Sequence, residues 1–303
     1  MSWNFEIKKV NLTKANKLPN MHVHSTWCIH ATNTLRSLNK KYESGFSFAL
    51  NEHMPYPEGF LKNSAQRFNL KSKQLFMVSG IPLSKIDKFI SAITKINFPV
   101  GFEVDYLEGY EKETINLMKN IENKFEKINK KLNHFSVSIH TLKGYSLFEE
   151  SSIRKLMEIY PPKDLIELYF KISIDAINKI PCDFICHPGL IELVFKKINL
   201  DLDEKLRKFL ISQYKLLIDE LVKLDIPIEI NTSGIKKGLS NPFMPYEVFK
   251  YAKNKNTKFV LGSDWHHPKC IYCCFDQLYD FLKKENIKYI YKIIEHKQIK
   301  VEI

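Results

Sequence analysis

The chain has 303 residues, of which 44% are hydrophobic, so it can bury a substantial core and is not expected to be disordered. No apolar stretch is long enough to cross a bilayer, and residues 1–6 lack the basic and apolar regions of a secretory signal. We therefore expect a soluble, cytoplasmic protein with no membrane partner. The net charge of +12 could indicate a nucleic-acid partner, but the lysines are scattered over helical patterns, which favours a solvated surface.

The six cysteines are too few and too unevenly spaced for a disulfide framework in a chain of this length. Cys270 and Cys273 have the spacing of half a zinc site, but no second Cys-x-x-Cys pair accompanies them. We therefore expect reduced thiols that pack as small buried hydrophobic side chains, Cys28 and Cys186 among them.

The first half of the chain alternates between apolar strand patterns and amphipathic helix patterns. In chain order, we predict strands over residues 18–23 and 46–50, a long loop with Pro55, Pro57 and Gly59, a helix over 84–96 capped by Ser84, a strand over 99–106, a helix over 111–132 and a strand over 134–140.

The second half continues this alternation. We predict a helix over residues 161–179, a strand over 183–187, a helix over 201–224, a strand over 226–231, a helix over 245–254, a strand over 258–264 and closing helices over 275–284 and 287–297. Strands separated by helices indicate right-handed crossovers and a parallel sheet. About seven strands is near the number that closes a barrel, and no linker divides the chain, so we predict one α/β domain over residues 1–303.

Ionisable side chains stand at or just after the carboxyl end of strand after strand. They are His22, His24, His30, His53, Glu103, His140, His187, Glu229, Asp264 and His266, with the polar Asn231 beside them. Each one alone could be an ordinary core or surface residue, but random placement does not explain the set. Because these strand ends meet in space in a parallel barrel, we predict a site for several metal ions.

The residues between these positions follow the period of a strand. Those in phase with the ionisable side chains are small or polar, namely Gly101, Ser136, Ser138 and Gly262. Those out of phase are apolar, namely Phe102, Val104, Phe135, Val137, Ile139, Ile228, Ile230, Phe259 and Leu261. We expect one set to face a narrow interior and the other to face the surrounding helices.

Taken in order, these motifs resemble the polymerase and histidinol phosphatase (PHP) superfamily over residues 18–270. The motifs are His22-x-His24 with His30, Asn51-Glu52-His53, Gly101-x-Glu103-x-Asp105-Tyr106, Val137-Ser138-Ile139-His140, His187-Pro188, Glu229-Ile230-Asn231 and Gly262-Ser263-Asp264-x-His266. Residues 102–110 and 230–234 look most like the histidinol-phosphate phosphatase branch.

This resemblance implies a distorted (β/α)7 barrel of the PHP type that holds three divalent ions, zinc, manganese or iron, at the carboxyl ends of the strands. The implied ligands are His22, His24, Glu103 and Asp264 for the first ion, Glu103, His140 and His187 for the second, and His30, His53 and His266 for the third. Mixed imidazole and carboxylate ligands suit these metals. Paired ions would supply a hydroxide for in-line attack, and the third would bind phosphate oxygens.

The expected reaction is hydrolysis of a small phosphomonoester, L-histidinol phosphate, to L-histidinol and phosphate in histidine biosynthesis. Asp264 or His266 is the candidate for giving a proton to the leaving oxygen. Glu52, Asp105, Glu229 and Asn231 could orient the imidazoles, or could be ordinary polar residues at the site's mouth. Substrate phosphate could be bound by Arg154, Lys143, Lys196, Lys236 and Lys237, although most basic residues are simply solvated.

Two positions depart from the commonest form of the superfamily. Asn20 stands where an aspartate is frequent, which would lower affinity for the first metal, and Trp265 replaces a smaller residue and would narrow the mouth. Three alternatives stay open: a PHP-fold phosphoesterase for another small phosphomonoester, one that acts on nucleic-acid ends, and a regulatory metal-binding domain without turnover. The oligomeric state and the metals bound are not predicted.

Overall fold

The computed structural model describes residues 2–8, 10–60, 62–63, 80–267 and 271–303. Its largest feature is a nine-stranded sheet in the order β1-β2-β3-β4-β7-β8-β9-β10-β11. The strands of this sheet are β1 (Asn20–Val23), β2 (Phe48–His53), β3 (Val100–Asp105), β4 (Phe135–Ser138), β7 (Phe184–Ile185), β8 (Ile228–Asn231), β9 (Phe259–Gly262), β10 (Tyr289–Ile294) and β11 (Lys297–Glu302). Pairing is parallel from β1 to β10, and β11 is antiparallel to β10. Every predicted strand is present.

The predicted barrel is not closed. The sheet order begins at β1 and ends at β11 without returning to its start. The two regions nevertheless approach each other, because an isolated parallel bridge pairs Val23 with Trp265 just beyond β9. At this bridge the backbone N–H of His24 donates to the carbonyl of Trp265 at 2.9 Å. The fold is therefore an α/β fold with a mostly parallel sheet whose strand ends converge.

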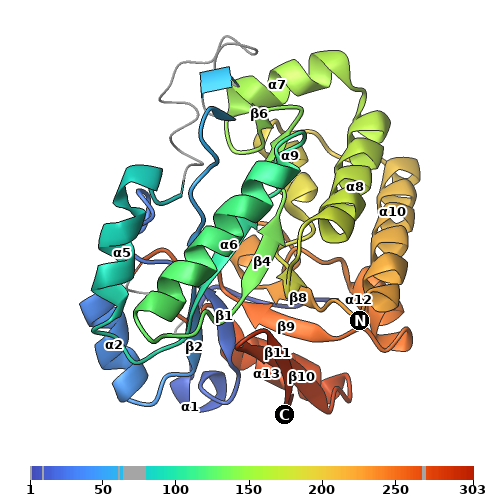
Figure 1. Ribbon diagram of the computed structural model, residues 1–303. Coiled ribbons are helices and arrows are strands. Elements are labelled where there is room, and N and C mark those ends of the chain that lie inside the picture. Colours follow the sequence, from blue (N-terminus) through green and yellow to red (C-terminus); the bar gives the residue numbers. More distant parts are fainter. Residues whose placement is uncertain (1, 9, 61, 64–79, 268–270) are drawn as a thin grey trace.

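Helices surround the strands (Figure 1). They are α1 (Leu12–Ala15), α2 (Leu35–Glu43), α5 (Ile86–Ile93), α6 (Glu111–Lys127), α7 (Glu150–Ile159), α8 (Pro162–Lys179), α9 (Leu190–Lys197), α10 (Glu204–Lys223), α11 (Ser233–Lys236), α12 (Tyr246–Asn254) and α13 (Phe275–Lys284). Helices α5, α6, α8, α10, α12 and α13 confirm sequence predictions. Ser84 does not cap α5, because it lies in the 3-10 turn η1 (Leu83–Lys85) that precedes the helix.

The helix predicted over residues 287–297 is wrong. This segment forms the hairpin of β10 and β11, whose turn residues Glu295 and His296 have φ of 49° and 62°. A second, unpredicted hairpin pairs β5 (Thr141–Leu142) with β6 (Tyr145–Ser146), directly after His140. Of the two cysteines with the spacing of half a zinc site, Cys270 lies outside the described residues, and Cys273 is buried, as expected of a small hydrophobic side chain.

The alternation within the strands separates the core from the interior, as predicted. All the out-of-phase apolar residues, from Phe102 to Leu261, belong to the main hydrophobic core that the helices share. The in-phase residues face polar groups: Ser136 donates to Asn51 at 3.0 Å, and Ser138 donates to Asp105 at 3.0 Å. No helix in the described part of the chain is long and apolar enough to span a membrane.

Candidate metal centre

The strand ends bring the predicted ligands into one cluster around Glu103. His22 and His24 come from the end of β1, His53 from β2, His140 and His187 from just after β4 and β7, and Asp264 and His266 from just after β9. The Glu103 oxygens are contacted by His187 Nε2 at 2.9 Å, His53 Nδ1 at 3.1 Å, His22 Nε2 at 3.2 Å and His140 Nε2 at 3.3 Å. The parallel strands bring together residues more than 80 positions apart in sequence, such as His22 and Glu103.

A second group of contacts joins the histidine pair of β1 to Asp264. The Nε2 atoms of His22 and His24 are 3.0 Å apart, and Asp264 Oδ1 is 3.7 and 3.3 Å from them. The two imidazoles therefore aim their outer nitrogens at one point, as a His-x-His pair on an extended strand should. His22, His24 and Asp264 form one set of donors, and His22, Glu103 and His187 form another.

The charges of the cluster fit a cation. Burial opposes ionisation of Glu103, but His53, His22 and the other imidazoles outweigh it and hold the pKa of Glu103 well below its usual range. Burial lowers the pKa of His53 to about 3 and that of His266 to about 4, so both imidazoles are neutral at pH 7. Ionised carboxylates and neutral imidazoles are the forms that bind divalent metals.

The pKa of His22 also shows that the cluster favours positive charge. Burial disfavours its protonation, but the attraction of Glu229 and of Glu103 outweighs that cost and raises the pKa of His22 well above its ordinary value. A centre that pulls a proton onto a fully buried imidazole is equally suited to a cation. The residues of this chain therefore fit the predicted metal ions by charge as well as by donor type.

Buried carboxylates contact the inner ring nitrogens of two of these imidazoles. Glu229 Oε1 accepts from His22 Nδ1 at 2.8 Å, and Asp105 Oδ1 lies 2.5 Å from His140 Nδ1. Such contacts are what the orienting role predicted for both carboxylates would require, and the role itself stays a prediction. Asn231 acts one step away, donating to Glu229 Oε2 at 2.9 Å. No contact recorded among the described residues joins Glu52 to a predicted ligand, and Glu52 accepts from the backbone N–H of Ser25.

The backbone around the cluster adopts conformations that few residues tolerate. His187 and Asp264 have φ of 25° and 46°, in the left-handed region, which costs on the order of 1–3 kcal/mol for a residue with a side chain. At Gly262 the constraint is space and not backbone conformation, because a Cβ there would lie 1.7 Å from Glu229 Oε1 and 2.7 Å from His22 Cβ. The small in-phase residue therefore leaves room for the carboxylate that holds His22.

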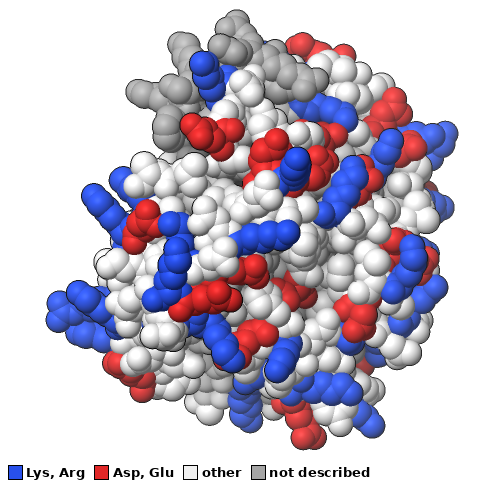
Figure 2. Space-filling view, in the orientation of Figure 1, with Lys and Arg blue, Asp and Glu red and all other residues white. Residues whose placement is uncertain are grey.

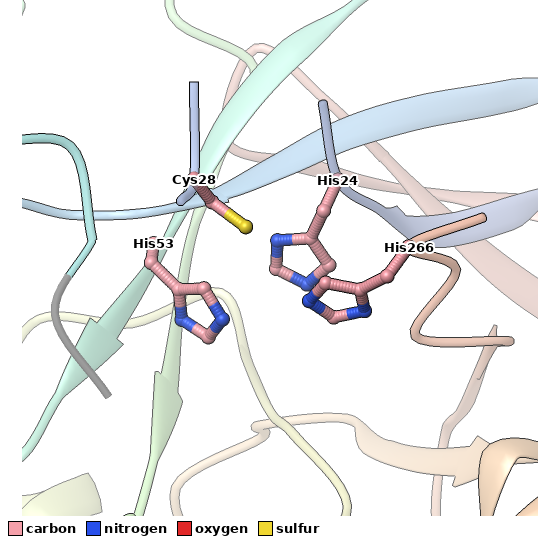
Figure 3. Close-up of side chains that lie close together, drawn as sticks. All are labelled: His24, Cys28, His53 and His266. Carbon is pink, nitrogen blue, oxygen red and sulfur yellow. The ribbon is translucent and has the colours of Figure 1, made fainter. Parts of the chain in front are cut away.

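The rim of the cluster differs most from the sequence prediction. His30 is exposed, and its ring centroid lies 4.5 Å from that of His266 and 5.2 Å from that of His53. The fully buried thiol of Cys28, which sequence reasoning treated as a small hydrophobic residue, instead forms a donor set with His24, His53 and His266 (Figure 3). The spacing of Cys28, two residues before His30, was the signal in the sequence.

Of the candidate substrate-binding residues, the structure brings Lys237 to the cluster, where its Nζ lies 2.5 Å from Asp264 Oδ2. Lys237 and Lys196 also line a pocket of about 360 Å³ together with Phe148, Leu193 and Lys197. Phe148 borders the cluster as well, because its ring centroid lies 5.1 Å from that of His140. Two residues that line the pocket therefore also contact the cluster.

The other candidates lie elsewhere. Lys143 pairs with Glu108 at 2.6 Å, Arg154 pairs with Glu150 of its own helix at 2.6 Å, and Lys236 is exposed at the end of α11. None of the contacts recorded in the described part of the chain joins these three to the predicted ligands. Lys197, which the sequence did not single out, donates to the carbonyl of Phe148 at 2.6 Å.

The two departures from the superfamily pattern prove to be structural. Asn20 is fully buried and ties β1 to β9, donating to Ser263 Oγ at 2.7 Å and accepting from the backbone N–H of Ser263 at 3.1 Å. Trp265 is 1% exposed and packs in the main core, so it does not narrow the mouth as predicted. Neither position argues against a cation at the cluster.

An α/β fold with clustered imidazoles and carboxylates at the ends of parallel strands is typical of metal-dependent hydrolases. The chain is 23% identical over 275 residues to a protein of Schizosaccharomyces pombe named "probable histidinol-phosphatase". The matched region covers 82% of this chain and 80% of that protein. No model of a protein family matches the sequence.

Solved structures agree with this likeness. The candidate histidinol phosphatase HisK of Listeria monocytogenes has a TM-score of 0.62 at 22% identity, covering 82% of this chain and 95% of that one. The histidinol phosphate phosphatase HisK of Lactococcus lactis, solved with zinc, L-histidinol and phosphate, has a TM-score of 0.65 at 14% identity, covering 93% of this chain and 99% of that one. The resemblance to histidinol phosphatases predicted from the sequence motifs is thus confirmed.

Proposed function

We propose that the protein is a metal-dependent phosphatase that hydrolyses L-histidinol phosphate to L-histidinol and phosphate. The observation that carries the proposal is the convergence on Glu103 of imidazoles from separate strands, among them His187 at 2.9 Å and His53 at 3.1 Å. The named relative in S. pombe and the L. lactis neighbour with L-histidinol and phosphate support the choice of substrate.

The ligand assignment predicted from the sequence remains our proposal. His22, His24, Glu103 and Asp264 would hold one ion, Glu103, His140 and His187 a second, and His53 and His266, with His30, a third. When bound, such ions acidify water and stabilise charge on phosphate oxygens. We also keep the distorted barrel as a proposal for the fold around the site, supported by the isolated bridge that joins Val23 of β1 to Trp265 after β9.

The chain's own side chains would bind the substrate and move its proton. The ammonium group of Lys237 lies between the ionised Asp264 and the adjoining pocket, where it would bind a phosphate oxygen. Asp264 and His266 stay the candidates for proton transfer to the leaving oxygen. Because burial is outweighed by Lys237 and His266, the pKa of Asp264 lies well below its usual range. Asp264 would therefore have to receive a proton from Lys237 or solvent before it could donate one.

Charge on the face seen in Figure 2 favours a small substrate over a nucleic acid. Figure 2 shows basic and acidic side chains interspersed over the visible face, without a continuous basic track. A continuous basic groove with stacking aromatic residues is typical of proteins that bind single strands. A cytoplasmic location and a single domain over residues 1–303 remain predictions.

Phosphate release from protein loaded with zinc or manganese tests the proposal, with histidinol phosphate compared against other small phosphomonoesters and a single-stranded oligonucleotide. We expect a clear preference for histidinol phosphate and its loss in Glu103→Gln. Glu192→Gln is the matched control, because this carboxylate also accepts side-chain hydrogen bonds, from Tyr214 and Asn241, away from the cluster. Faster release from the oligonucleotide would overturn the proposal.

A further inference from the structure

Cys28 lies where the resemblance leads one to expect only histidines. Its sulfur forms a donor set with His24, His53 and His266 in which all ligand atoms lie within 4.8 Å of one another. His30, the histidine expected at this position, is exposed and belongs to none of the donor sets found among the described residues. The sulfur also lies 3.6 Å from His30 Nδ1, so the thiol contacts His30 as well as the buried donor set.

A second observation points to a ligand at the same place. His24 is fully buried, and its Nε2 atom already faces His22 at 3.0 Å and Asp264 at 3.3 Å. Its Nδ1 atom has no hydrogen-bond partner among the described residues. In Figure 3 a ring nitrogen of His24 lies on the side of the Cys28 sulfur, and the rings of His53 and His266 face the same space. A buried nitrogen without a partner is costly, so its position beside the buried thiol points to a polar or charged species bound at this place.

The other thiol near the cluster does not share this property. Cys186 forms a donor set with His22 and Glu229, but the members of that set already have partners. Glu229 accepts from His22 Nδ1 and from the backbone N–H of His187 at 2.7 Å, and Cys186 accepts from Asn51 at 3.6 Å. That set is a satisfied hydrogen-bond network, so of the two described thiols that belong to these donor sets, Cys28 is the one available to a cation.

We propose that Cys28 supplies a thiolate to the cation that His53 and His266 hold, making this rim position a mixed sulfur and nitrogen site that prefers zinc. The inference rests on the proposed metal-dependent function and extends it to metal selectivity. On binding, the S–H bond of Cys28 breaks, a sulfur–zinc bond forms and the proton passes to solvent. Soft thiolate ligands favour zinc over manganese, so this position would discriminate between metals that the positions with only imidazole and carboxylate ligands accept alike.

Cobalt substitution tests the proposal, because a thiolate bound to Co²⁺ gives an intense near-ultraviolet charge-transfer band and imidazole or carboxylate ligands do not. We expect the band in the wild-type protein titrated with Co²⁺, and its loss in Cys28→Ser. We also expect zinc at one position to bind at least about 10- to 100-fold more weakly in that variant, the loss that follows removal even of an orienting partner. Cys182→Ser is the matched control, and Cys186→Ser tests the neighbouring thiol; both should keep the band.

A wild-type titration without the band, or a band that persists in Cys28→Ser and disappears in Cys186→Ser, overturns the proposal. Should Cys28→Ser fail to fold, cadmium-113 resonances of the wild type decide, since a thiolate shifts one resonance far downfield and its absence refutes the site. The band without phosphate release would leave this metal site standing and refute the proposed substrate. Phosphate release without the band would do the reverse.

Discussion

Replacing Glu229 by glutamine tests whether this carboxylate orients the imidazole of His22, because the change leaves every predicted metal ligand in place. Both donors to Glu229 Oε2, the His187 backbone N–H at 2.7 Å and Asn231 Nδ2 at 2.9 Å, require an acceptor there. The glutamine oxygen must therefore occupy this position, which turns its NH₂ group toward His22 Nδ1, 2.8 Å from Oε1 in the wild type. His22 can pair with that donor only if Nδ1 becomes an acceptor, and the ring proton then moves to Nε2. That proton blocks the nitrogen aimed at the cluster.

The expected cost follows from this tautomer change. Loss of the orienting partner of a metal-binding histidine costs roughly 10- to 100-fold in metal affinity, about 1.4 to 2.7 kcal/mol. The fold itself should tolerate Glu229→Gln, because every donor and acceptor around the new amide still has a partner. We expect the unfolding free energy of the ion-free protein to change by less than about 1 kcal/mol.

Chelator competition measures the zinc affinity, and urea unfolding in excess chelator measures the stability of the ion-free protein. Glu192→Gln again serves as control and should leave zinc affinity unchanged. Wild-type zinc affinity in Glu229→Gln would refute the orienting role. A loss of stability in chelator as large as the loss of affinity would show that Glu229 acts on the fold and not on His22.

Three further predictions follow from single contacts. Gly262→Ala should destabilise the protein by about 1–3 kcal/mol in urea unfolding and reduce zinc content, since the added methyl group overlaps Glu229; wild-type values of both would contradict this. Lys237→Met should raise KM for histidinol phosphate by roughly 10-fold or more with less effect on kcat, and Lys237→Arg should recover part of the loss; an unchanged KM would exclude phosphate binding by this residue. The hydrogen bond to Asp183 raises the pKa of His296 above the ordinary imidazole value of 6.5. The pair therefore stabilises the fold fully when the pH is below 6.5, and this stabilisation is lost as the pH rises through the raised pKa. His296→Gln should therefore lower unfolding stability modestly in acid and less in base, and an equal effect at both would count against the pair.

Sequence reasoning succeeded where a strong local pattern and a global rule agreed. Each predicted parallel strand is present, because apolar runs separated by long amphipathic helices leave few other arrangements. The same rule placed Glu103 and His187 in contact from distant positions. Closure of the sheet could not be predicted in this way, since it depends on the accumulated twist and on the local bridge at Val23.

The missed hairpin has an equally local cause. Residues 289–294 form a short apolar run whose periodicity does not separate a strand from a buried helix. The turn that would have decided the matter is Glu295-His296, with both residues at positive φ. Tight hairpin turns of this kind usually carry asparagine or glycine, and neither stands here. The fold holds this turn through tertiary contacts, such as the pair between His296 and Asp183 at 2.8 Å, that no local pattern records.

The cluster is costly in the absence of a cation, and this cost is itself an argument for one. Glu103 and Glu229 are buried carboxylates, His22 and His24 turn their nitrogens toward each other at 3.0 Å, and Asp264 holds a left-handed backbone. A fold would not be expected to retain so many unfavourable features together unless a bound species offset them. Binding of a cation to the folded chain alone adds RT ln(1 + [L]/Kd), about 2.7 kcal/mol at a hundred times Kd, for each site filled. The strained residues bind the ion only in the folded state, so ion binding stabilises the conformation that carries the strain. The strain can therefore persist here, although a core with no bound ion would be expected to lose it.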